Sequence, residues 1–367
     1  MEPSRLRGGL RGILILAGLM AAARPSIVLA QGESAVPFLL IAPNARADGM
    51  GEAGAGLADD VGAIHWNPAG LAFLDGQELS ITHSNWLPQF GQSDLFYEYL
   101  NYRNRIESLG GTVGASVTYL NLGEFVRTLN DPTPLGTFKA FELAVTGGYA
   151  TKVADNFGLG LNLRFIYSSL SPVGTAAEEG NGVGSSVSFD IAALYKPQIS
   201  GFEDRIGIGV NLSNLGPKIT YIDQAQADPL PTNIRLGISV KVLQSDFNNL
   251  SVNTDFSRLL VRRYGDGTSD PFYKGIFSAW GDRGLKKVTI GTGVEYWYGQ
   301  PRLLALRYGY FYEHPEAGGR KFHTFGAGIR YDMYGFDFSY LSTVEEGHPL
   351  AETLRFTLVL SWGGEGQ

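Results

Sequence analysis

The chain has no cysteine and no hydrophobic run long enough to form a membrane-spanning helix. The absence of cysteine excludes disulfides, thiolate metal ligands and cysteine nucleophiles. A spanning helix needs about 20 consecutive apolar residues, so helical transporters are excluded as well. The net charge of −7 argues against a nucleic-acid-binding surface, and no basic cluster offsets it. A membrane protein of this composition is restricted to a β-barrel, because an open sheet leaves backbone groups unpaired in lipid.

Strict alternation of apolar and polar residues is what the sequence does contain. Between Phe141 and Tyr167, two alternating runs flank the turn Asp155-Asn156. A period of two indicates β-strands, and Asx residues between two strands indicate a tight hairpin. Each arm exceeds the roughly 9–11 residues that a tilted strand needs to cross a bilayer. One face is apolar and the other carries Gly, Asn, Arg and Lys, which fits lipid outside and a hydrated lumen inside. A large soluble β-sandwich is the alternative.

The same pattern recurs along the chain and predicts an all-β fold, a transmembrane antiparallel β-barrel of about 14 strands. Long connections alternate with short ones, which is typical of long outer loops and short periplasmic turns. This parity predicts that both termini lie in the periplasm. The predicted strands are Gln77–His83, Leu95–Tyr102, Gly111–Leu122, Ala140–Ala154, Phe157–Leu170, Ser186–Lys196, Arg205–Leu215, Asn233–Val242, Asn249–Leu260, Val288–Tyr298, Leu303–Tyr312, Phe322–Tyr331, Phe336–Ser342 and Thr353–Trp362.

Residues 1–30 are expected to be a secretory signal peptide. Three arginines precede the apolar run Gly12–Ala23, which is too short to be a membrane anchor. Small residues offer two cleavage sites, after Ala23 or after Ala30. The chain is therefore expected to be exported.

Residues 31–76 do not alternate and are rich in Gly, Ala and Asp. Their apolar side chains need burial, so we expect this segment to fold back into the lumen as an N-terminal plug; a flexible periplasmic tail is the alternative. Residues 77–362 are expected to form the barrel and residues 363–367 a short periplasmic tail. The last strand ends in Trp362. An amphipathic, aromatic-ended final strand resembles the signal read by outer-membrane assembly machinery, which predicts an outer-membrane location.

The sequence indicates no catalytic or metal-binding site. The five histidines are scattered, and none has the spacing of a metal ligand pair. Gly49-x-Gly51-x-x-Gly54 matches the dinucleotide fingerprint, but no strand precedes it and no βαβ unit follows. A tightly packed turn of the plug is the better interpretation. We expect no enzyme, no cofactor and no metal. A barrel lipid hydrolase, with His323 as an imagined base, would need a Ser–His pair on the outer wall.

Charged residues of both signs are predicted to face the lumen. A selective pore would show one sign clustered at a constriction. The mixture therefore favours a paired interior that holds a plug over an open porin. These residues are Glu142, Lys152, Arg164, Asp190, Lys196, Arg235, Lys241, Asp255, Glu295, Arg307, Arg330, Asp337 and Arg355.

Aromatic residues stand out at two kinds of position. In the connection Val261–Lys287 they are interleaved with charges on what is expected to be the outer surface. Exposed aromatic patches mark partner-binding sites; alternatively, the loop covers the barrel mouth and buries them. Near strand ends, aromatic residues are predicted to form the interfacial girdles of the membrane. The predicted girdle residues are Tyr296, Trp297, Tyr298, Tyr308, Tyr310, Tyr312, Tyr331 and Tyr334.

The stretches Ala42–Gly54 and Trp66–Leu71 resemble the PorV/PorQ family, FadL-like outer-membrane proteins of the type IX secretion system. The Asn-Pro-Ala-Gly-Leu string in the second stretch is similar to one shared more widely by FadL-type barrels. The strings Ser213–Ile219 and Thr118–Glu124 resemble the PorV branch. The residues of the plug motif are Asn67, Pro68, Ala69, Gly70 and Leu71.

The resemblance implies a FadL-like barrel with an N-terminal plug and a carrier function. Such a protein would bind the C-terminal β sorting domain of secreted cargo leaving the large translocon barrel. It would then deliver the cargo to a surface attachment complex. The barrel itself would be surrounded by outer-membrane lipid. The connections Val261–Lys287, Ser171–Ser185 and Gly216–Thr232 are expected to bind cargo. Their candidate contact residues are Phe272, Tyr273, Phe277, Trp280, Pro217 and Tyr221.

The alternative function is a FadL-type channel for small hydrophobic molecules. A channel predicts an apolar pocket that runs continuously from the loops to the plug. A carrier predicts a filled or polar lumen below hydrophobic loops.

Overall fold

The computed structural model describes residues 33–91, 94–128, 133–172, 181–223 and 226–364. The predicted signal peptide lies outside the described residues. Glu33 onward belongs to one compact unit. Within the described ranges, no helix has both the length and the apolar character needed to span a membrane.

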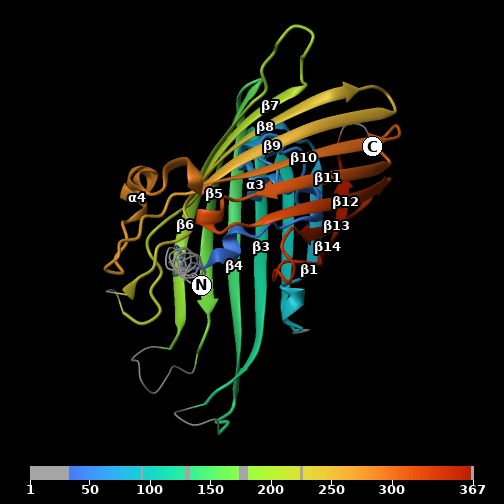
Figure 1. Ribbon diagram of the computed structural model, residues 1–367. Helices are drawn as coiled ribbons and strands as arrows, with labels where there is room; N and C mark the ends of the chain where they lie inside the picture. Colours follow the sequence, from blue (N-terminus) through green and yellow to red (C-terminus); the bar gives the residue numbers. More distant parts are fainter. Residues whose placement is uncertain (1–32, 92–93, 129–132, 173–180, 224–225, 365–367) are drawn as a thin grey trace, which may run out of the picture. The chain divides into compact units, whose positions relative to one another are not determined.

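In the described part of the chain, fourteen antiparallel strands close into a barrel (Figure 1). Each strand pairs with its neighbours in sequence, and β1 pairs with β14 to close the sheet. The predicted 14-stranded barrel is confirmed and a soluble sandwich is wrong. The strands are β1 (Gln77–Asn85), β2 (Phe96–Ile106), β3 (Gly111–Val126), β4 (Thr137–Ala154), β5 (Phe157–Ser169), β6 (Val183–Tyr195), β7 (Ile206–Leu215), β8 (Asn233–Gln244), β9 (Asn248–Leu259), β10 (Val288–Tyr298), β11 (Leu304–Tyr312), β12 (Lys321–Tyr331), β13 (Tyr334–Thr343) and β14 (Thr353–Trp362).

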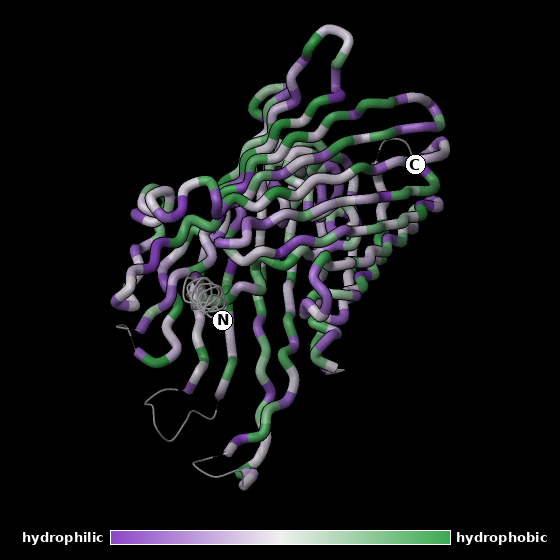
Figure 2. The backbone as a smooth tube through the Cα atoms, viewed as in Figure 1, coloured by the Kyte–Doolittle hydropathy of each residue, from purple (hydrophilic) through white to green (hydrophobic). Residues whose placement is uncertain are grey.

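Alternation along the strands gives the barrel its two faces. In β4, Phe141 and Val145 point outward, whereas Glu142 and Thr146 are buried on the inner side. Hydrophobic and hydrophilic residues alternate in this way along many of the strands in Figure 2. The outer wall therefore presents apolar side chains, as a lipid-facing surface requires.

A row of aromatic rings crosses five neighbouring strands near the end of the barrel that carries the β1–β2 and β3–β4 connections. Consecutive ring centroids are 5.7–6.2 Å apart. Beyond this row, the next residues of β3 and β4 whose side chains face away from the lumen are the polar Asn121 and Lys139. The row therefore marks one border of the apolar band. We call it the upper aromatic row; it consists of His83, Phe96, Tyr119, Phe141 and Tyr167.

One predicted girdle residue is wrong. Trp297 has the same parity in β10 as the lumenal Glu295, and it is only 4% exposed. The guanidinium groups of Arg302, Arg307 and Arg330 lie 5.3–5.9 Å from its ring centroid. Trp297 thus belongs to the polar interior, because strand parity decides which face a side chain occupies. Four other predicted girdle residues are exposed: Tyr298, Tyr308, Tyr331 and Tyr334.

The N-terminal segment fills the lumen as predicted. α2 contacts β12, β13 and β14, and η2 contacts the opposite wall from β3 to β6. Its apolar residues Phe38, Ile64 and Leu71 pack with inward-facing residues of β2 to β6. The plug elements are η1 (Pro37–Leu40), α2 (Ala45–Asp48), α3 (Ala63–Trp66) and η2 (Pro68–Phe73). The connecting elements are η3 (Pro88–Phe90), η4 (Glu107–Leu109), α4 (Phe272–Ser278), η6 (Ala279–Gly281), η7 (Gly284–Lys287) and η8 (Pro315–Ala317).

β3 and β4 extend further than predicted. Residues 123–139 were expected to form a loop, but the two strands remain paired up to Val126 and Thr137. A bulge between Asn121 and Gly123 shifts the register, so that Phe125 and Phe138 stack at 5.7 Å. The bulge interrupts the alternation on which the prediction depended, and the hairpin projects beyond the upper aromatic row.

Candidate functional site

A chain of buried ion pairs joins the plug to the barrel wall. Arg46 of α2 contacts Glu295 at 2.7 Å and Asp59 at 2.7 Å. Glu295 also accepts from Arg307 at 2.8 Å, and Arg307 contacts Asp337 at 2.8 Å. Nine of the thirteen predicted lumenal charges take part in ion pairs, which makes their burial tolerable. Glu142 instead accepts from the hydroxyl of Ser168.

A second set of polar contacts fixes the plug at other points of the wall. Arg355 of β14 pairs with Asp48 at 2.5 Å, and Ser339 donates to the same carboxylate at 2.6 Å. Asp255 of β9 accepts from the backbone N–H groups of Gly54 and Ala55, both at 2.9 Å. Plug and wall thus supply hydrogen-bond partners to several of each other's buried polar groups.

The glycine string is a packing motif, as the tight-turn interpretation predicted. Gly51 has φ +67°, and a Cβ there would lie 2.7 Å from the carbonyl oxygens of Thr292 and Tyr310. A Cβ at Gly54 would lie 2.7 Å from the ring of Trp66. Only glycine allows the plug backbone to approach the wall this closely.

The plug motif 67–71 also serves this attachment. The Asn67 amide donates to the carbonyl oxygens of Ala55 (2.9 Å) and Ala193 (3.0 Å), and its own oxygen caps η2 by accepting from Ala69 N at 3.1 Å. Pro68 begins η2, Leu71 is fully buried, and a Cβ at Gly70 would overlap the backbone of Ala58.

Little space remains in the lumen. Two cavities between the described plug residues and the wall measure about 10 and 20 Å³, and a third within the plug measures about 10 Å³. Such a cavity has room for about one water molecule. The described lumen is therefore filled and largely polar, as the carrier hypothesis predicts.

The connection between β9 and β10 folds around Asp270. Its carboxylate accepts from Lys274 (2.8 Å) and Ser278 (2.6 Å) of α4 and from Tyr264 (2.9 Å), which ties α4 to the preceding part of the connection. Shielding from water raises the pKa of Asp270, but these hydrogen bonds outweigh that effect and lower the pKa to about 2. The carboxylate is therefore charged at neutral pH, and it holds α4 in place.

α4 presents aromatic side chains to the surroundings. Tyr273, Phe277 and Trp280 are 64%, 78% and 44% exposed, so the loop does not bury them. Phe272 is half-buried and meets the outward-facing Phe189 of β6 edge-on at 6.3 Å. The structure therefore brings the four predicted residues together as an exposed surface, which we call the α4 aromatic surface.

The two other predicted contact residues lie in the connection between β7 and β8. Pro217 is exposed, and its carbonyl oxygen accepts from Ser186 at 3.0 Å. Tyr221 packs against the apolar cluster of the plug, and burial raises its pKa to about 12. Lys218 donates to the carbonyl oxygen of Ser269 at 2.7 Å, which links this connection to the one that carries α4.

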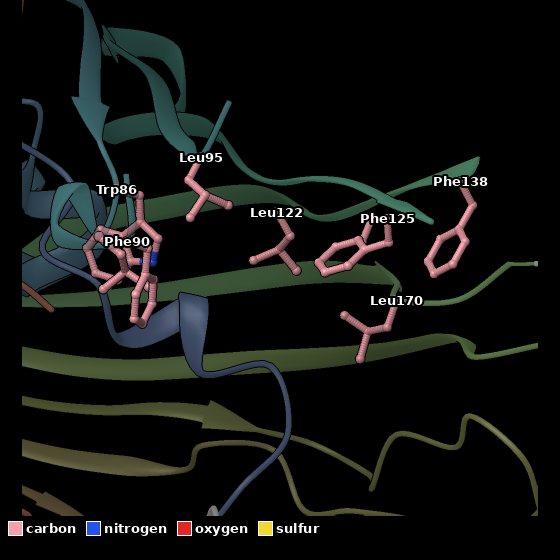
Figure 3. A pocket seen from close by; sticks show the side chains of 9 residues that line it. Trp86, Phe90, Leu95, Leu122, Phe125, Phe138 and Leu170 are labelled. Carbon is pink, nitrogen blue, oxygen red and sulfur yellow. The ribbon is translucent and has the colours of Figure 1, made fainter. Parts of the chain in front are cut away.

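An apolar pocket of about 460 Å³ opens at the mouth of the barrel (Figure 3). We call it the mouth pocket. The β1–β2 connection forms one side, and β3, β4 and the end of β5 form the other. Sequence reasoning missed it because its lining comes from four separate stretches. The lining residues are Trp86, Leu87, Phe90, Leu95, Leu122, Phe125, Phe138, Ala140 and Leu170.

In the described ranges, no group of three or more His, Asp or Glu side chains is arranged to hold a metal ion. His323 faces outward and bonds to Tyr308 at 2.9 Å. The contacts of this histidine are aromatic: the rings of Tyr308 and Tyr310 lie 6.0 and 5.0 Å away.

Comparisons with known proteins agree with this architecture. The family model "Type IX secretion system protein PorV" matches residues 29–265. No curated protein sequence matches significantly. Among solved structures, the Ralstonia pickettii toluene transporter TbuX is 14% identical, with a TM-score of 0.53 over 88% of this chain and 98% of that one. The Pseudomonas putida toluene transporter TodX is 10% identical, with a TM-score of 0.51 over 88% and 99%. At these identities, the structural likeness shows a shared fold.

Proposed function

Because the chain belongs to the PorV family of the type IX secretion system, we propose that it is the barrel that carries secreted proteins at the outer membrane. It would bind the C-terminal β sorting domain of cargo leaving the translocon and deliver the cargo to the surface attachment complex. In this proposal the end with the long connections faces outward and the end of β14 faces the periplasm. The expectation that both termini are periplasmic does not hold for Glu33, the first described residue, because its carboxylate pairs with Lys287 of the β9–β10 connection at the outer end.

The α4 aromatic surface is the observation that supports this proposal best. Aromatic residues dominate the energetics of protein interfaces because they bury a large area at little entropic cost. Phe277, at 78% exposure, has no role in the packing of the barrel itself. A cargo domain docked on α4 would cover it.

The filled lumen supports a carrier over a channel. Toluene transporters share the fold, and the mouth pocket favours a second candidate, a channel for small hydrophobic molecules. That channel needs an apolar path through the plug. The pairs of Glu295 with Arg46 and Arg307 place buried charges between α2 and the wall at β10 and β11, and the cavity beside Phe38 and Leu39 measures only about 10 Å³.

The test is purification of the tagged barrel from its native outer membrane, followed by mass spectrometry of whatever is bound. Wild type should recover secreted proteins that share a C-terminal β-domain, together with a very large barrel. Tyr273→Ser/Phe277→Ser should reduce cargo recovery by at least about tenfold, because each aromatic anchor contributes on the order of 1–2 kcal/mol.

Phe202→Ser is the matched control. Phe202 is 50% exposed in the β6–β7 connection, at the opposite end of the barrel. Cargo recovery with this variant should equal that of wild type. A wild-type preparation that contains only a small apolar ligand would reject the carrier and favour the channel.

A further inference from the structure

The mouth pocket lies beyond the apolar band of the barrel wall. Along β3, Leu122 and Phe125 follow Tyr119 of the upper aromatic row, and along β4, Phe138 lies beyond Phe141 in the same direction. These pocket residues belong to the inner face of the hairpin, so the strands separate them from the lipid side. A lipid in the bilayer therefore has no direct route into the pocket.

The chemistry of the lining selects an uncharged, apolar occupant. The indole nitrogen of Trp86 is the only polar side-chain atom among the lining residues, and none of them is basic. A fatty acid or a phosphorylated lipid would bring an anionic group that needs a charged or hydrogen-bonding partner. Free fatty acids and lipid headgroups are therefore poor candidates.

The floor of the pocket is closed. Trp86 and Leu122 pack against the plug cluster that contains Phe38 and Leu39. The next cavity along that direction, beside Phe38 and Leu39, measures about 10 Å³. A transported solute would have no onward path, so the pocket has the form of an anchoring site and not of an entrance.

The pocket is also built at some cost to the backbone. Leu87, which lines the pocket, has φ +50°. This is a left-handed backbone conformation that residues other than glycine rarely adopt. Such strain persists where the surroundings impose it, and it concentrates at binding sites. The β-bulge at Asn121/Gly123 likewise turns Phe125 and Phe138 into the same wall.

We propose that the mouth pocket is an anchor site that receives aromatic or branched aliphatic side chains from an extended segment of a secreted protein. The pocket volume of about 460 Å³ falls within the range of specific ligand sites. The inference rests on the proposed carrier function and deepens it: cargo would be held at two places, on the α4 aromatic surface and in the mouth pocket.

The experiment uses the full barrel in lipid nanodiscs, because detergent would compete for an apolar pocket. The probe is the C-terminal domain of the most abundant secreted protein recovered with wild type. Two variants alter the pocket in opposite ways. Phe125→Ser/Phe138→Ser removes its apolar wall, whereas Ala140→Phe keeps it apolar and fills the space. Both should weaken binding of the domain by about 30-fold, the loss typical of an anchor residue.

The matched control is Val126→Ser/Thr137→Ser. These two residues pair with each other one position further along the same hairpin, on its opposite face, and do not line the pocket. This control should bind as wild type does. Thermal unfolding of all variants establishes that the barrel is intact, and a photo-crosslinker at position 122 should label an aromatic or aliphatic residue of the bound domain.

The outcomes separate the two proposals. If wild type recovers secreted cargo and both pocket variants bind it with wild-type affinity, the anchor site is refuted and the carrier function stands. Crosslinking at position 122 to lipid alone would refute it as well. If wild type recovers no secreted protein, the carrier function and the anchor site both fall.

Discussion

At the scale of single residues, the attachment of the plug in the lumen depends on charged side chains that have no access to bulk water. Asp48 and Arg355 have side-chain exposures of 0% and 2%, and each is the other's ionic partner. Removing one member of such a pair leaves a buried charge without compensation, which is more costly than never having had the pair.

Arg355→Met should therefore destabilise the barrel by about 3–5 kcal/mol. Lys286→Gln breaks the exposed pair with Glu316 and should leave the free energy of unfolding nearly unchanged, because water screens this pair. The measurement is urea-induced unfolding followed by tryptophan fluorescence. Equal losses for the two variants would show that the lumenal pair is not isolated from solvent.

Sequence parity predicted that Arg355 faces the lumen, because alternation is a local property. Its partner could not be predicted, since Asp48 lies 307 positions away and belongs to a segment without periodicity. The same holds for the mouth pocket, whose walls meet only after the barrel has closed.

At the scale of elements, α4 is a short helix held by one carboxylate. Seven residues are too few for an isolated helix to be stable in water, so the bonds to Asp270 set its position. The sequence indicated an aromatic loop here but no helix, because α4 is too short to show periodicity. The strands were predictable for the opposite reason: each of them repeats the pattern over many residues.

The depressed pKa of Asp270 gives the α4 connection a defined response to acid. A carboxyl group whose pKa is lowered in the folded state stabilises the fold at pH values above its ordinary pKa. This stabilisation is lost as the pH falls through the folded-state pKa. Cleavage by pepsin beside Phe277 should therefore rise as pH falls from about 4 to about 2.

Rates of cleavage are normalised to an unfolded substrate at each pH. Asp270→Asn, which cannot carry the charge, should be cleaved readily across the whole range. A wild-type profile as flat as that of the variant would mean that Asp270 does not hold α4.

At the scale of the whole molecule, the filled lumen of the described chain predicts that this barrel is not an open pore. The purified protein should show no steady conductance steps in a planar bilayer. Urea weakens apolar and polar contacts alike, and steps should appear when it releases the plug. Steady conductance without urea would show that water and ions pass the plug in the native state.

The contacts that attach the plug constrain the order in which the chain folds. Residues 45–55 leave the ribosome early, yet their partners include Asp255, Glu295 and Thr357, the last of them 312 positions later. Contacts at such separations slow folding, because a long loop must close before any of them forms. The plug can become native only after the final strands exist. Docking of the N-terminal segment must therefore wait for strands that are synthesised last.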